Sequence, residues 1–272
     1  MKNKITAKAL TESAIMIALS TVLSLLKIVE FPYGGSVTIA SALPIAIISY
    51  RYGIKLGLLS STVYGIVQQL LGLSTLSYVT TWQSVVAIIL LDYIVAFAVI
   101  GLAGMFRKLI KNQAVAIALG GACVCLLRYI CHVISGATVW AGLSIPDSAA
   151  LIYSFIYNAT YMVPETIVFI IAALYIGSAI DFSRPTITRL IKKKVPNNVS
   201  WISPVAGLIA CGTLIFNVAM ISSKLQNADT GEFYIQGIFD VNWIAVSIVT
   251  GIAAVAVIVL FAVRKALIEQ NK

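Results

Sequence analysis

Long apolar stretches separated by short polar connections make up most of this chain of 272 residues. A helix needs roughly 20 mostly apolar residues to cross about 30 Å of hydrocarbon. By that criterion the pattern predicts about eight membrane-crossing helices. These are Thr6–Ile28, Thr38–Tyr50, Gly53–Leu73, Trp82–Phe106, Ala114–Val139, Ala149–Ile180, Ile202–Ser222 and Trp243–Val263.

The composition supports the same interpretation. Hydrophobic residues make up 60% of the chain and charged residues 11%, and the mean hydropathy is +0.98. These values lie far from those of soluble globular domains. We therefore expect an all-α integral membrane protein that crosses the cell membrane several times, with the lipid bilayer as its surroundings.

The basic residues indicate the orientation of these helices. Sixteen of the 19 Lys and Arg residues fall on one side of the predicted topology, and only Lys27, Arg128 and Lys224 do not. The positive-inside rule makes the crowded side cytoplasmic and places both termini there. The net charge of +9 is then explained by cytoplasmic loops beside an anionic leaflet, and we expect no nucleic-acid partner.

The chain divides into three parts by composition. Residues 1–180 contain six of the predicted helices joined by short loops, and we expect them to form a six-helix substrate-binding membrane domain. Residues 181–200 are polar and basic, which is typical of a cytoplasmic linker. Residues 201–272 hold the last two helices, a transmembrane hairpin that carries no charge in the interior of either helix.

Several kinds of chemistry are missing from the sequence. It contains no G-x-x-x-x-G-K-[ST] phosphate loop, no H-E-x-x-H and no G-x-S-x-G, and it has a single histidine. Cys131 precedes His132, but two further ligands at suitable spacing for a metal are missing. We therefore predict that the chain is not an enzyme, has no ATPase site of its own, and uses no catalytic residue, metal or cofactor.

Polar residues gather at one depth of the predicted helices. Asp92 lies about ten residues, or ~15 Å, from the outer end of its helix. Arg128 and His132 lie at comparable depth on the next helix and share one face, because they are four residues apart. Tyr153, Tyr157 and Asn158 follow on the sixth helix. This asymmetry favours a pocket that opens to the outside.

A carboxylate surrounded by aromatic rings suits a cation or an aminated heteroaromatic ring, through charge and cation–π contacts of about 0.5–2 kcal/mol each. Simpler explanations stand beside this one. Asp92 and Arg128 could equally neutralise each other, because charges within a membrane usually pair. Trp140 and Tyr153 are shallow enough to belong to an interfacial aromatic belt.

Residues 1–180 resemble the thiamine-specific substrate-binding S component of energy-coupling factor (ECF) transporters. The similar stretches include Leu91-Asp92-Tyr93 on the fourth helix, Arg128-Tyr129-Ile130-Cys131-His132 with Gly136 and Trp140 on the fifth, and Tyr153 to Asn158 on the sixth. Further matches run from Gly35 to Pro44, from Tyr52 to Leu59 and over Gly101–Gly104.

The resemblance implies a six-helix bundle that binds thiamine from outside at high affinity. It further implies docking onto a transmembrane coupling protein and two ATP-binding-cassette (ABC) subunits through an alanine pattern on the first helix, matched here by Ala14 and Ala18. The implied thiamine-binding residues are Asp92, Tyr93, Arg128, His132, Trp140, Tyr153 and Asn158. We add Tyr157, from its depth, and Tyr33, from the first outer loop.

Two positions depart from the family's pattern. Its acidic residue is usually glutamate, one methylene longer than Asp92, and its first outer loop usually offers a tryptophan where this chain has Phe31 and Tyr33. The alternatives are therefore an S component for a related vitamin or a thiamine precursor, a self-sufficient ion-coupled transporter, and a structural membrane subunit without a ligand.

Overall fold

The computed structural model describes residues 5–31, 34–79, 81–139, 150–190, 199–225 and 234–270. The chain forms two compact units, Met1–Arg189 and Leu190–Lys272. Unit 1 begins with α1 (Ala7–Leu25), the hairpin of β1 (Lys27–Glu30) and β2 (Ser36–Thr38), α2 (Leu43–Tyr52), α3 (Ile54–Leu71) and η2 (Leu73–Tyr78). It continues with α4 (Trp82–Ile88), η3 (Ile89–Val95), α5 (Ala96–Ala98), η4 (Val99–Lys108), α6 (Gln113–Thr138), α7 (Ala150–Ala179) and the short strands β3 (Ile180–Asp181) and β4 (Thr188–Arg189).

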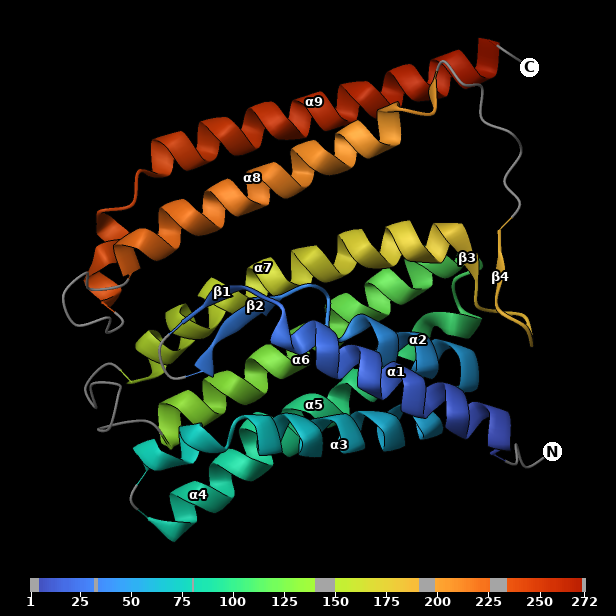
Figure 1. The fold of residues 1–272 in the computed structure, drawn as a ribbon. Helices are drawn as coiled ribbons and strands as arrows, with labels where there is room; N and C mark the ends of the chain where they lie inside the picture. The colour runs from blue at the N-terminus through green and yellow to red at the C-terminus, as the bar shows by residue number, and fades with distance from the viewer. Residues whose placement is uncertain are drawn as a thin grey trace. The chain divides into compact units, whose positions relative to one another are not determined.

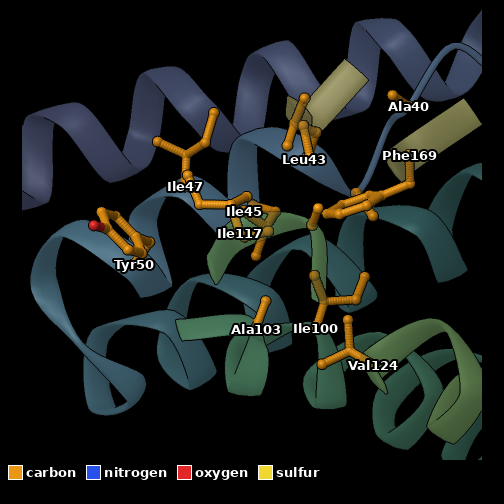
Figure 2. Packing of buried hydrophobic residues seen from close by; sticks show 14 of the residues in the cluster. Ala40, Leu43, Ile45, Ile47, Tyr50, Ile100, Ala103, Ile117, Val124 and Phe169 are labelled. Carbon is orange, nitrogen blue, oxygen red and sulfur yellow. The ribbon is translucent and has the colours of Figure 1, made fainter. Parts of the chain in front are cut away.

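The core of unit 1 lies where α2, η4, α6 and α7 meet (Figures 1 and 2). Ile45, Ile100 and Ile117 are each at most 1% exposed there, and the ring of Phe169 lies against them. Close approach of α6 and α7 requires Gly121, because a Cβ at this position would lie 1.6 Å from Cε1 of Phe169. Small residues that let helix backbones approach are the usual means of packing in membranes.

Six helical segments of the described residues are long and apolar enough to cross a membrane. They are Ala7–Leu25, Trp82–Lys108, Gln113–Thr138, Ala150–Ala179, Ile202–Leu225 and Trp243–Gln270. The predicted segments Thr38–Tyr50 and Gly53–Leu73 are not among the six, although α2 and α3 overlap these stretches. Thr38 belongs to β2, and α2 has only ten residues, which gives a helix of about 15 Å. The apolar run is buried inside the protein instead.

The segment from Trp82 to Lys108 changes its winding along its length. It begins as the α-helix α4, widens into the π-helix η3, passes through the α-helix α5 and tightens into the 3₁₀-helix η4. Ser49 supports the tight part, because its Oγ donates to the Gly101 carbonyl at 2.5 Å and accepts from the Gly104 N–H at 2.9 Å. Short π segments are frequent at functional sites, and this one contains Asp92.

A polar cluster joins three segments at the end of unit 1 where α1 begins. Arg51 Nε donates to Glu12 Oε2 at 2.9 Å, and its Nη1 donates to the carbonyls of Phe182 and Arg184, both at 2.8 Å. The Arg51 side chain is only 3% exposed. Nearby, hydrogen bonds from Ser183 hold the pKa of Asp181 below its ordinary value. Several residues that the charge pattern assigns to the cytoplasm thus meet at one end; the orientation of the termini stays a prediction.

Unit 2 contains α8 (Ile202–Leu225), the short η7 (Ile235–Phe239) and α9 (Trp243–Gln270). The two long helices pack side by side (Figure 1), and Asn217 Nδ2 on α8 donates to Thr250 Oγ1 on α9 at 2.8 Å. Most of their large apolar side chains are exposed, among them Leu208, Ile244 and Ile252. Such surfaces suit lipid contact.

Candidate functional site

A cavity of about 290 Å³ lies in unit 1 between η3, α6 and α7. It occupies the end of the bundle opposite the Arg51 cluster, because Ser24 and Leu25 at the end of α1 line it whereas Glu12 near the start of α1 contacts Arg51. Its size is close to the lower limit for pockets that bind small molecules, ~300 Å³. Seven of the predicted binding residues line it, namely Asp92, Tyr93, Arg128, His132, Tyr153, Tyr157 and Asn158.

The Asp92 carboxylate is held by two residues of α6. His132 Nδ1 lies 3.0 Å from Asp92 Oδ1, and Ser135 Oγ donates to Asp92 Oδ2 at 2.6 Å. The side chains of Asp92 and His132 keep 16% and 12% exposure. The site therefore presents a carboxylate of fixed orientation beside an imidazole ring, and both groups line the cavity.

Arg128 does not pair with Asp92. Its guanidinium lies over the ring of Phe97, with Cζ 4.6 Å from the ring centroid, and the side chain is buried. Among the described residues no carboxylate oxygen lies within 4.0 Å of it, and its Nε has no hydrogen-bond partner. Arg128 and Asp92 therefore form no direct ion pair in the described part of the chain.

The tyrosines of α7 form one wall of the cavity. Tyr153, Tyr157 and Tyr161 are each less than 10% exposed and line it together, because a spacing of four residues places them on one helix face. The rings of Tyr157 and Tyr161 pack edge to face with centroids 5.7 Å apart. The imidazole ring of His132 packs edge to face with the Tyr161 ring, with centroids 6.2 Å apart. Burial of Tyr153 among these rings does not fit a lipid-facing aromatic belt.

Asn158 connects α7 to α6. Its Nδ2 donates to the carbonyl of Ser154 at 2.8 Å and to that of His132 at 3.3 Å, and its Oδ1 accepts from the Tyr161 hydroxyl. Gly136 permits this contact, because a Cβ there would lie 2.1 Å from Ser154 Oγ. Asn158 therefore shapes the wall of the cavity, and part of its hydrogen-bonding capacity is already used inside the protein.

Tyr93 closes the side formed by η2. Its hydroxyl lies 3.1 Å from Thr75 Oγ1 and donates to the Gly72 carbonyl at 3.4 Å. A Cβ on Gly72 would lie 2.2 Å from the Tyr93 hydroxyl, so glycine is required for this close approach. The Tyr93 ring stacks on the Phe97 ring. The guanidinium of Arg128 lies over the same Phe97 ring.

The hairpin of β1 and β2 is bonded to α7. Glu165 Oε2 accepts from the Thr38 backbone N–H at 2.6 Å, and Glu165 Oε1 accepts from Thr38 Oγ1 at 2.7 Å. Gly35 N–H donates to the Tyr157 hydroxyl at 3.3 Å. These contacts fix the first outer segment against the helix that supplies most of the aromatic rings.

The remaining predicted residues have different positions. Tyr33 and Trp140 lie outside the described residues. Ala14 and Ala18 are exposed on α1, away from the buried Ser13 and Ser20. Such a position is compatible with a contact surface, and their partner-docking role stays a prediction.

Sequence reasoning did not identify Ser135 or Thr38 as parts of the site, and it placed Tyr161 beside Tyr153, Tyr157 and Asn158 without assigning it a binding role. Ser135 follows His132 by three residues and Tyr161 follows Tyr157 by four, so helical spacing from a predicted site residue could have found both. Thr38 had no such signal, because its contact with Glu165 joins residues 127 positions apart in the sequence.

Three comparisons with known proteins bear on this site. Residues 10–181 match the family described as "Thiamine transporter protein". The thiamine transporter ThiT of Bacillus subtilis (strain 168) is 38% identical over 170 residues, which cover 58% of this chain and 84% of that protein. A solved structure of ThiT from Listeria monocytogenes superposes with a TM-score of 0.52 at 20% identity, covering 62% of this chain and 92% of that one. The last likeness concerns the fold.

Proposed function

This chain belongs to the thiamine transporter protein family, and we propose from that premise that it is the thiamine-binding S component of an ECF-type importer. It captures the vitamin from outside the cell in the cavity between η3, α6 and α7. The observation that carries the proposal is the Asp92 carboxylate, fixed by His132 and Ser135 within a cavity walled by tyrosines.

The chemistry of thiamine matches this arrangement. Its thiazolium ring carries a permanent positive charge, which the Asp92 carboxylate can neutralise, and which aromatic faces attract by about 0.5–2 kcal/mol each. Its aminopyrimidine ring offers donors and acceptors to the hydroxyls of Tyr153 and Tyr157. In surroundings of low polarity the ligand charge requires a partner of opposite sign, and Asp92 supplies it.

Energy for transport would come from other chains. The sequence holds no phosphate-loop motif, so the proposed importer includes a transmembrane coupling protein and ABC ATPase subunits. The exposed face of α1 around Ala14 and Ala18 is the surface that we assign to the coupling protein, because small residues permit close helix contact in a membrane.

Isothermal titration of the purified full chain with thiamine tests the proposed function. We expect one thiamine per chain, and weaker binding of the separate pyrimidine and thiazole moieties. If another vitamin binds in a panel of titrations and thiamine does not, the assignment of thiamine as the ligand is wrong. Uptake of thiamine by liposomes that contain this chain alone, driven by a proton gradient, would instead favour a self-sufficient transporter.

A further inference from the structure

Ser135 contacts the cavity only through another residue. Its side chain is fully buried in α6, and among the described residues that line the cavity Ser135 is not included, although His132 and Gly136 are. Its hydroxyl nevertheless donates to Asp92 Oδ2 at 2.6 Å. A ligand in the cavity would therefore contact Asp92 and not Ser135.

The acceptor of this hydrogen bond is a carboxylate, whereas Ser49, Ser61 and Ser154 donate across to backbone carbonyls of neighbouring segments. Serine and threonine inside a helix commonly donate to the carbonyl four residues earlier. Several do so here, namely Thr11, Ser13, Thr21, Thr62, Thr138, Thr166 and Thr213. Ser135 instead donates across to η3. The hydroxyl that α6 would otherwise use for its own backbone is directed to a carboxylate on a neighbouring helix.

The contacts with His132 and Ser135 together restrict the rotation of the Asp92 carboxylate. The torsion that turns an aspartate carboxylate is broad and poorly fixed by the side chain itself. In this site Oδ1 contacts His132 and Oδ2 accepts from Ser135, so the plane of the carboxylate is set by two residues one helical turn apart. His132 also lines the cavity and can be drawn towards a ligand, whereas Ser135 is held in the core.

We infer that Ser135 is a positioning residue that holds the Asp92 carboxylate facing the cationic group of the ligand. The inference rests on the proposed function, since it assigns Asp92 to the positive charge of thiamine. The Asp92 side chain is thereby fixed from behind by a buried hydroxyl.

The Ser135→Ala variant distinguishes this positioning role from a purely structural one when its Kd values for two ligands are compared with those of the wild-type chain. One ligand is thiamine, and the other is its uncharged analogue with a thiophene in place of the thiazolium ring. Without the Ser135 hydroxyl the carboxylate can turn away from the cation, so we expect the Kd for thiamine to rise about tenfold, which corresponds to about 1.4 kcal/mol. The Kd for the uncharged analogue should change by less than about twofold.

Each outcome of this titration has a definite meaning. Equal loss of affinity for both ligands would show that Ser135 only supports the fold, and unchanged affinity for thiamine would also overturn the inference. If the wild-type chain binds no thiamine, the proposed function fails instead. Ser135→Cys, which keeps the size and a weak donor, should give an intermediate Kd and replaces the alanine variant if that variant does not fold.

A double substitution gives an independent test. In an Asp92→Asn background the carboxylate that Ser135 orients is gone, so adding Ser135→Ala should change the Kd for thiamine by less than about twofold. If the two substitutions lower the affinity additively, Ser135 acts through something other than Asp92 and the inference is wrong.

Discussion

His132 Nδ1 lies 3.0 Å from Oδ1 of Asp92, which joins the single histidine of the chain to a carboxylate on a π-helical turn. Arg128, one turn earlier on α6, is directed to Phe97 instead. Asp92 and His132 both line the cavity. An organic cation bound there would lie beside the Asp92 carboxylate.

Removing the charge of Asp92 tests its assignment to the ligand cation. Asp92→Asn keeps the shape of the side chain but removes its charge, so we expect the Kd for thiamine to rise about 10- to 100-fold, given about 1.5–3 kcal/mol for a charged hydrogen bond. Titration calorimetry measures it. Glu269→Gln, an exposed acidic residue near the end of α9, is the matched control and should leave the Kd unchanged.

Asp92 and Glu165 both line the cavity, but their roles differ. Both carboxylate oxygens of Glu165 accept hydrogen bonds from Thr38, so Glu165→Ala removes an anchor of the first outer segment. We expect Asp92→Ala to weaken thiamine binding more than Glu165→Ala, and Glu165→Ala to make the chain near Thr38 more accessible to proteolysis. The opposite order of affinities would mean that the cation lies near Glu165.

The Arg51 cluster should affect stability without affecting binding. Arg51→Met removes the ion pair with Glu12, which keeps the Tyr52 hydroxyl as a donor, and leaves the carbonyls of Phe182 and Arg184 without the Arg51 donor. A hydrogen bond to a charged group contributes about 1.5–3 kcal/mol to stability. We expect a lower Tm in detergent and an unchanged Kd for thiamine. Lys55→Met, an exposed basic residue near the same end, is the control. A changed Kd with unchanged Tm would contradict this separation.

Gly121 is required by the contact of α6 with α7. A Cβ there would meet the buried ring of Phe169 at 1.6 Å, so Gly121→Ala should destabilise the protein by about 1–3 kcal/mol, as overpacking of a core does. Gly212→Ala on α8, where a Cβ meets nothing within 4 Å, is the control for thermal unfolding. Phe169→Ala should lessen the effect of Gly121→Ala; strictly additive losses would contradict the proposed clash.

Unit 2 should be dispensable for binding. Every described residue that lines the cavity belongs to unit 1, and the family match ends at residue 181. A chain that ends at Arg189 should therefore bind thiamine with the Kd of the full chain. A loss of affinity in a truncated chain that retains the Tm of unit 1 would show that residues 190–272 contribute to the site.

The charged and aromatic parts of the site could be predicted because intramembrane polar residues are rare. Asp92, His132 and Tyr157 stand out against an apolar background, and helical spacing places them at similar depth. The hydrophobic pattern also located the long helices. It could not show that Ile89–Val95 winds as a π-helix, because apolar content does not determine the number of residues per turn.

Other features depended on contacts distant in the sequence. Every residue from Leu43 to Tyr50 in α2 is buried inside the protein, and composition alone does not distinguish burial in protein from burial in lipid. Arg128 has an aromatic partner instead of an acidic one, which pairing by charge could not predict. The Ser135–Asp92 hydrogen bond spans two helices and leaves no trace in the hydrophobic pattern.

The central claim is that the cavity between η3, α6 and α7 binds thiamine through Asp92. Titration calorimetry of the purified full chain and of Asp92→Asn, both shown to be folded by thermal unfolding, tests it most directly. The account predicts one tightly bound thiamine per wild-type chain and a Kd at least about tenfold higher for the variant. No binding by the folded wild-type chain, or an equal Kd for both proteins, would contradict it.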